Sequence, residues 1–185
     1  MSDFKGFESD RYKQHDAIIK KLVAEFNKDK AKFIDCSTEQ AKGIADLSEA
    51  LVKSWAIQES GGNDTRSLAA WAKDPLQVNV PGDWSDYKTS TGLKKPTHRN
   101  EGTAEQNIRA AISWLARKGF GKSGQPPKNR AAAVFDGWQV ALQRYNGRSA
   151  LTSNGQKYRD NYAKQIITRA ENPGKHIEIQ LPKPV

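Results

Sequence analysis

The stretch from Ser37 to Asn79, STEQAKGIADLSEALVKSWAIQESGGNDTRSLAAWAKDPLQVN, decides the fold that the sequence predicts. Apolar residues recur in it at intervals of three and four, as on the buried face of a helix: Ile44, Leu47, Leu51 and Trp55. We therefore expect one helix from Thr38 to Gln58. Ser37 and Gln40 have the spacing of a capping box, and the glycine pair 61–62 can take positive φ and end the helix.

Glu59 follows Trp55 by four residues, so we expect it to leave the last turn of this helix on the buried face. Burial disfavours the charged form of a carboxyl and raises its pKa from about 4.3 towards about 6. A carboxyl that keeps its proton near neutral pH can act as a general acid. A carboxylate at a helix C-terminus also opposes the helix dipole, which favours a functional role over a plain helix-end carboxylate.

Four blocks of the sequence resemble, in order, the lytic transglycosylases and goose-type lysozymes: IQESGGN at 57–63, PLQVN at 75–79, NIRAAISWL at 107–115 and ALQRYNG at 141–147. The resemblance extends over about residues 38–170. It implies a mainly α, lysozyme-like single domain with a small β or loop subregion and an extra N-terminal helix. It also implies cleavage of peptidoglycan at the β-1,4 bond between N-acetylmuramic acid and N-acetylglucosamine.

Within this family, the resemblance implies that Glu59 is the catalytic acid and base and that five residues line the substrate cleft: Ser60, Gln77, Asn79, Tyr145 and Asn146. In a lytic transglycosylase the same carboxylate then takes the proton of the muramyl C6 hydroxyl, so no second carboxylate is needed. The alternatives are structural: Ser60 bonds carbonyl groups at the helix end, and Tyr145 anchors a helix.

A hydrolase needs a base to activate water. Goose-type lysozymes carry an Asp just after the Gln-Val pair, but Asn79 stands there in this chain. Asp74 is the candidate closest to the Gln77 segment, and the others are Asp64, Asp83 and Asp86. Each is also open to interpretation as a solvated loop carboxylate. The sequence therefore leaves hydrolysis and anhydro-forming transglycosylation as alternatives.

The composition bounds the function. The 185 residues suit one domain, and the single Cys36 excludes an intramolecular disulfide. A net charge of +9 favours anionic partners, either nucleic acid or peptidoglycan with its stem-peptide carboxylates. The basic residues are spread along the chain and no nucleic-acid motif is present, so we expect peptidoglycan rather than nucleic acid. His15, His98 and His176 are scattered, so neither a metal nor another cofactor is expected.

Delivery is predicted from the ends of the chain and its hydropathy. Residues 1–10 are polar and acidic, without the order of a signal peptide, and no apolar run is long enough for membrane insertion. We therefore expect a monomer that is made in the cytoplasm and acts in the periplasm or cell wall. The candidates are an antibacterial toxin exported by a type VI secretion apparatus and opposed by an immunity protein, and a phage endolysin. A non-catalytic peptidoglycan-binding module is the alternative.

The remaining pattern divides the chain into an N-terminal extension helix (1–36), a catalytic domain (37–172) and a tail (173–185). Further periodic stretches predict helices at 10–33, 103–118, 129–145 and 155–171. Alternation of apolar and polar residues predicts a short strand at 76–80 and an edge strand or extended tail near 177–181.

Overall fold

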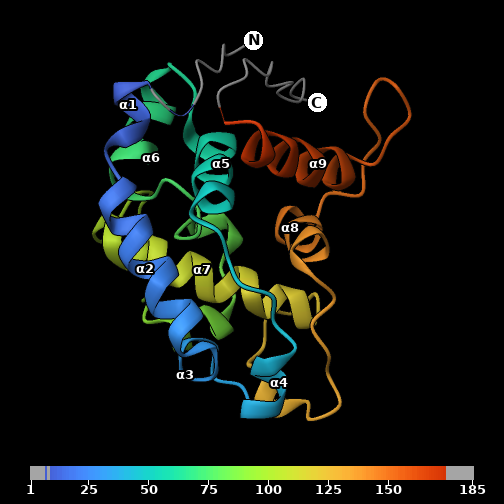
Figure 1. Cartoon of the computed structure of the whole chain (residues 1–185). Coiled ribbons are helices and arrows are strands. Elements are labelled where there is room, and N and C mark those ends of the chain that lie inside the picture. Colours follow the sequence, from blue (N-terminus) through green and yellow to red (C-terminus); the bar gives the residue numbers. More distant parts are fainter. Residues whose placement is uncertain (1–6, 8, 174–185) are drawn as a thin grey trace.

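The structure, a computed structural model, describes residue 7 and residues 9–173. In this part the chain is mainly helical (Figure 1), so the prediction of a mainly α single domain is confirmed. The α-helices are α1 (Asp10–Lys13), α2 (Asp16–Lys28), α3 (Lys30–Ile34), α4 (Thr38–Lys42), α5 (Glu49–Ser60), α6 (Thr65–Lys73), α7 (Ala104–Phe120), α8 (Trp138–Asn146) and α9 (Tyr158–Glu171). The short 3-10 helices are η1 (Pro81–Asp83), η2 (Asp86–Thr91) and η3 (Pro127–Asn129).

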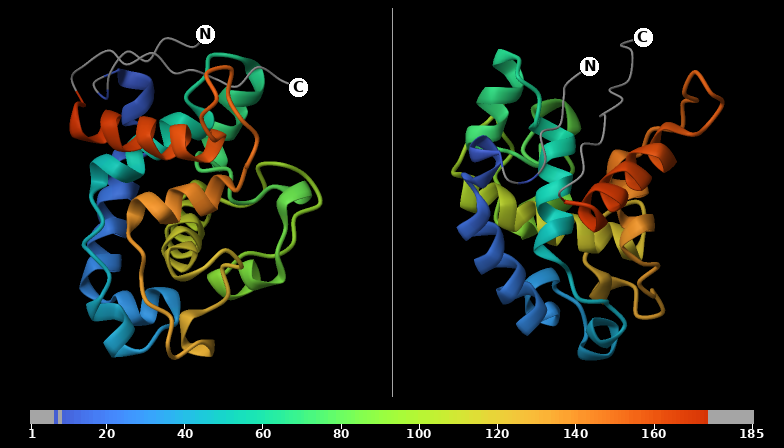
Figure 2. Two further views of the ribbon diagram at one scale, coloured as in Figure 1. Left: turned by 90° about the vertical axis from the view of Figure 1, so that its right-hand side faces the viewer. Right: turned by 45° about the horizontal axis from the view of Figure 1, so that its top comes forward.

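Helix α7 is the centre of the domain. The left view of Figure 2 looks down its axis, with α8 above it, α2 to one side and η2 to the other. Its side chains Ile108, Ile112 and Leu115 are fully buried. A capping box of Thr103 and Gln106 opens this helix, which runs two residues beyond the predicted end at 118, to Phe120. Burial on every side of α7 joins the other helices into one core.

The predicted N-terminal helix at 10–33 is three helices instead of one. The chain breaks before α2, where the His15 imidazole bonds the carbonyl of Trp71 at 2.6 Å, and again at Asp29, whose carboxylate caps α3. Apolar periodicity persists across both breaks because Leu22 and Ile34 still face the core. Helices α1 to α3 thus share the core of the rest of the chain, and the boundary predicted at residue 36 marks no division in it.

The helix expected at 38–58 is also interrupted. The capping box of Ser37 and Gln40 is present, but it opens only the short α4, and Ser48 caps a separate helix, α5. Between them, Asn27 donates to the carbonyl of Leu47 and accepts from its N–H, both at 2.9 Å. Leu47 is buried in this irregular segment. The spacing between Leu47 and Leu51 matches a helical period. Hydrogen bonds from the Asn27 side chain to the backbone nevertheless hold this segment in an irregular conformation.

Two later helices start later than expected. The helix predicted from 129 begins at Trp138, after Gly137 at φ 96°, and Val134, in the part of that range that is not helical, is 71% exposed. The helix predicted from 155 begins at Tyr158, after a loop that contains an isolated antiparallel bridge between Leu151 and Lys157. The strand predicted near 177–181 lies outside the described residues, as does the predicted tail except for residue 173.

Among the described residues, no helix combines the length and apolar character required to cross a membrane.

Candidate active site

Glu59 occupies the last turn of α5, which ends at Ser60 with Gly61 as its C-cap. Gly61 has φ −73°, so the helix does not end through a left-handed glycine as expected. The requirement for glycine is steric, because a Cβ at Gly61 would clash with the carbonyl oxygen of Ile57. At Gly62 a Cβ would lie 2.7 Å from Oγ of Ser67. The two glycines let the chain turn closely against α5 and α6, and this leaves Glu59 at the edge of a cleft.

The cleft has a volume of about 760 Å³, within the range of about 300–1,000 Å³ that is usual for ligand sites. Its walls come from the end of α5, from α6, from the segments around residues 77–83 and 99, and from the end of α8 with the residues that follow. Four of the residues predicted for the site line it: Glu59, Gln77, Tyr145 and Asn146. Three do not, namely Ser60, Asp74 and Asn79, which are buried behind the wall.

A chain of two hydrogen bonds holds the Glu59 carboxyl. The Trp55 indole N–H donates to the hydroxyl oxygen of Tyr162 at 3.0 Å, and the Tyr162 hydroxyl donates to Oε1 of Glu59. Because Trp55 is an obligate donor, it leaves the Tyr162 proton to point at the carboxyl. Trp55 lies one turn before Glu59 on α5, and Tyr162 comes from α9. The relay fixes one carboxyl oxygen, and Glu59 remains partly exposed at the cleft.

The surroundings of Glu59 raise its pKa to about 7. Burial is the main cause, because desolvation disfavours the carboxylate. The hydrogen bond from Tyr162 lowers this pKa, the nearby charge of Asp74 raises it and that of Arg148 lowers it. The Trp55 side chain also lowers this pKa by hydrogen bonding, and desolvation prevails over these three groups that stabilise the anion. The predicted elevation of the Glu59 pKa has a structural basis in this pocket.

The segment 76–80, predicted to form a strand, belongs instead to an irregular loop (residues 74–80) fixed by side chains. Ser60 donates to the carbonyl of Pro75 at 2.7 Å and Tyr145 to that of Leu76 at 2.7 Å. The buried Lys88 ammonium donates to the carbonyl of Val78 at 3.0 Å. These bonds satisfy the backbone groups that a partner strand would otherwise bond, which explains why no ladder forms.

Asp74 fixes the same loop from its other side. Its two carboxylate oxygens accept the N–H groups of Val78 at 3.1 Å and Asn79 at 2.9 Å. The residue is fully buried, which raises its pKa, while the two N–H groups and the charge of Lys88 oppose the rise. The interpretation of Asp74 as a solvated loop carboxylate is therefore wrong. Its geometry is that of a carboxylate that shapes the cleft wall.

Gln77 and Asn79 occupy different positions around this loop. Gln77 has φ 51°, a conformation that is uncommon for residues other than glycine. Its amide nitrogen donates to the carbonyl of Asp74 at 2.9 Å, and its amide oxygen accepts from Arg99 at 3.3 Å. The Asn79 amide points into the protein and donates to the carbonyl of Glu101 at 3.1 Å. Only Gln77 of this pair can offer an amide to a ligand in the cleft.

Tyr145 and Asn146 end α8 at the cleft. The Tyr145 ring packs edge-on against Trp55, with ring centroids 4.7 Å apart. Burial raises the pKa of its hydroxyl well above the usual value, so Tyr145 stays neutral. Its one proton is given to the carbonyl of Leu76, and Tyr145 thus supports the loop as well as lining the cleft.

Sequence reasoning missed four residues of this site. Tyr162 belongs to the helix predicted at 155–171, and it lies 103 positions from Glu59 in the chain. Arg66, Arg99 and Arg148 also line the cleft and come from three separate segments. No local motif links these residues to Glu59, so no sequence signal was available to find them.

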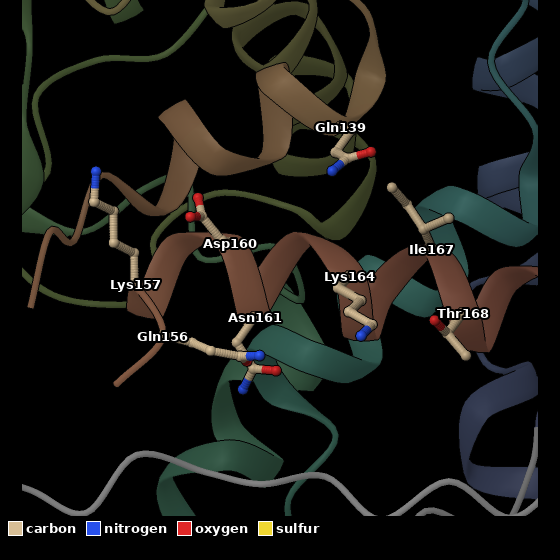
Figure 3. A pocket seen from close by; sticks show the side chains of 8 residues that line it. All are labelled: Gln139, Gln156, Lys157, Asp160, Asn161, Lys164, Ile167 and Thr168. Atoms are coloured by element: carbon tan, nitrogen blue, oxygen red, sulfur yellow. The ribbon is translucent and has the colours of Figure 1, made fainter. Parts of the chain in front are cut away.

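A second hollow, of about 370 Å³, lies between α8 and α9 and contains none of the predicted site residues. Figure 3 shows Asp160, Lys164 and Thr168 along α9, with Gln139 of α8 opposite them. In the part of the chain that the structure describes, His, Cys, Asp and Glu side chains form no group of three or more suited to a metal ion.

Comparison with family models, curated proteins and solved structures gave no match to this chain.

Proposed function

We propose that this protein cleaves the glycan strands of peptidoglycan at the β-1,4 bond between N-acetylmuramic acid and N-acetylglucosamine, with Glu59 as general acid and base. One observation carries the proposal: a carboxyl group with a pKa of about 7 borders an open cleft. Such a group can give a proton in one step and accept one in the next at neutral pH. The resemblance to lytic transglycosylases and goose-type lysozymes supports the same role, and a mainly helical domain is compatible with the lysozyme-like fold that it implies.

The reaction begins with protonation of the leaving group. Because Tyr162 occupies Oε1 of Glu59, the transferable proton resides on Oε2. It moves to the glycosidic oxygen as the bond to the anomeric carbon breaks and positive charge develops on the sugar ring. The Glu59 carboxylate stabilises that charge. It then takes the proton of the muramyl C6 hydroxyl, whose oxygen forms the new bond to the anomeric carbon and closes the anhydro ring.

The contacts of the cleft carboxylates favour the route through the C6 hydroxyl. The Asp64 carboxylate accepts from the backbone N–H of Ser67 at 3.0 Å and from its hydroxyl at 2.6 Å. Asp74 has both oxygens occupied by backbone N–H groups and does not reach the cleft. A hydrolytic base is thus less available than the single acid and base that the anhydro route needs.

Lysozyme chemistry is the second candidate, and Asp83 is the observation in its favour. Its side chain is 80% exposed beside the cleft, and its contact with the ammonium of Lys88 is 3.3 Å long. Asp83 is therefore the carboxylate that we would assign to a hydrolase as its base, in place of Asp74.

The test is digestion of purified peptidoglycan sacculi, with the released muropeptides identified by mass spectrometry. We expect anhydro-muramyl ends from the wild-type protein and none from Glu59→Gln. The matched control is Glu49→Gln, which removes an exposed carboxyl from the first turn of the same helix. Reducing ends would establish the hydrolase instead, and Asp83→Asn should then abolish release. No release by any of these proteins would overturn the enzymatic proposal and favour a wall-binding module.

The proposed substrate lies outside the cytoplasm, so the protein acts in the periplasm or cell wall as an exported antibacterial toxin or a released endolysin. Expression with a periplasmic signal should lyse cells, whereas the same fusion carrying Glu59→Gln should be tolerated. A toxin also requires an immunity protein, and the cleft is the site that such an inhibitor would block. Tolerance of the active, folded fusion would contradict the antibacterial role.

A further inference from the structure

In the cleft beside Glu59, the positively charged side chains have fewer partners within the protein than the carboxyl groups have. More positive than negative charge is therefore available to contact a ligand. Three arginines line it: Arg66 in the first turn of α6, Arg99 before α7 and Arg148 after α8. All three are exposed. A guanidinium group keeps its proton at every physiological pH, so this charge is permanent.

The three carboxyl groups of the cleft already have partners. Glu59 accepts from Tyr162, Asp64 accepts from Ser67, and Asp83 is paired with Lys88. Because its pKa is about 7, the Glu59 carboxyl is about half protonated near pH 7, so it balances little of the positive charge of the arginines. The hydrogen-bond and ion-pair partners of these carboxyl groups are thus residues other than the three arginines, and Arg148 acts on Glu59 only through its nearby charge.

The arginines themselves have few contacts. Among the described residues, none of the three belongs to an ion pair, whereas Arg109, Arg144 and Arg159 each contact a carboxylate. Arg99 donates one hydrogen bond of 3.3 Å to Gln77, and Arg148 lies over the ring of Tyr158, 5.6 Å from its centroid. Most of their N–H donors are therefore available at the cleft.

Guanidinium groups match carboxylates because two parallel N–H groups can bond both oxygens. We propose that Arg66, Arg99 and Arg148 bind carboxylate groups of the peptides that flank the cleaved sugar bond, and thereby make this protein selective for peptide-bearing glycan over neutral polymers of N-acetylated sugars. This inference rests on the proposed function. It adds a specificity determinant to it, since Arg148 is close enough to affect the charge of Glu59.

Binding is measured apart from cleavage by using the Glu59→Gln protein and co-sedimentation with sacculi. The test variant adds Arg66→Gln, Arg99→Gln and Arg148→Gln. The matched control adds Lys20→Gln, Lys28→Gln and Lys32→Gln, which remove the same charge from exposed positions of α2 and α3. We expect the arginine triple to weaken binding by about tenfold or more, consistent with the loss of several charge-assisted hydrogen bonds, and the lysine control to stay within about twofold.

Chemically altered sacculi identify the bound group. Sacculi whose carboxylates are converted to methylamides should bind about tenfold more weakly, and the arginine triple should cause no further loss on them. Sacculi stripped of phosphodiester polymers with hydrofluoric acid should bind normally. Loss of binding after the acid treatment would assign the arginines to phosphate and overturn the proposal. Equal weakening by both triple variants, or unchanged binding to methylamide sacculi, would also overturn it.

Nucleic acid is the competing polyanion. Duplex and single-stranded DNA should fail to displace the protein from sacculi at 0.15 M salt. Efficient, steeply salt-dependent displacement that the arginine triple abolishes would overturn the proposal in favour of a nucleic-acid site. Muropeptide release by the wild-type protein, together with equal binding by both triple variants, would refute only the arginine role. Arginine-dependent binding without any release refutes only catalysis.

Discussion

The hydroxyl of Tyr162 donates a hydrogen bond to Oε1 of Glu59 and accepts one of 3.0 Å from the indole N–H of Trp55. This relay joins the last helix, α9, to the C-terminal end of α5. It also occupies one of the two carboxyl oxygens of Glu59 and leaves the other without a bond from Tyr162. Substitutions in this relay and in the loop 74–80 beside it should change the rate of muropeptide release and the stability of the protein.

Replacement of Tyr162 by Phe removes the donor to Glu59. The pKa of Glu59 should rise above about 7, because the hydrogen bond from Tyr162 favours the anion. A general acid is active when protonated, so the alkaline limb of the pH profile should move to higher pH, while the maximal rate falls about tenfold or more from loss of positioning. Muropeptide release against pH measures both. Tyr87→Phe, at an exposed tyrosine, is the control, and a lowered rate with an unmoved limb would limit Tyr162 to a structural role.

The pKa of Glu59 also predicts how stability depends on pH. It is about 7 in the folded protein against 4.5 without the fold, so the folded state binds the proton more tightly. The resulting stabilisation is full below about pH 4.5 and is lost as pH rises to about 7 and above. The Glu59→Gln variant has no carboxyl group to ionise at this position, so it does not lose this stabilisation as pH rises. Its melting temperature minus that of the wild type should therefore grow by several degrees from pH 4.5 to pH 8, equivalent to at most about 3 kcal/mol.

Calorimetry at matched ionic strength measures that difference. Glu49→Gln, on the exposed start of the same helix, should show a pH-independent offset from the wild type. A constant offset for Glu59→Gln as well would contradict the raised pKa.

Gly61→Ala should destabilise the protein by about 1–3 kcal/mol, because the added methyl group meets the carbonyl oxygen of Ile57 inside α5. Gly82→Ala, where a Cβ meets nothing within 4 Å, should change stability by less than about 0.5 kcal/mol. Urea denaturation of the two variants measures the contrast. Equal stability would show that the turn after Glu59 relaxes without cost.

Asp74→Asn should cost about 2–3 kcal/mol, because an amide has one acceptor oxygen for the two N–H groups of Val78 and Asn79. Asp86→Asn, at an exposed residue of η2, is the control and should have little effect. Denaturant titration gives the stability, and the pH profile of muropeptide release gives the chemistry. A variant that folds as stably as the wild type but loses activity would return Asp74 to a catalytic role.

The sequence by itself determined the helical class of this protein and the position of its central carboxyl. Glu59 lies in the last turn of a helix whose buried face includes Trp55, and the expected capping box of Ser37 and Gln40 is present, although it opens only α4. These features depend on contacts within one or two turns, so a linear pattern contains them.

Only the tertiary structure decided where the helices end and which residues surround Glu59. Asn27 bonds the backbone of Leu47, 20 residues away, and so replaces the middle of an expected helix with an irregular segment. Tyr162 reaches Glu59 across 103 residues, and the cleft arginines converge from three segments. Such contacts arise from packing around α7, and they produce no periodic pattern in the sequence. The sequence could therefore locate the carboxyl group at the end of α5, whereas its hydrogen-bond partner and the charge of the cleft beside it required the fold.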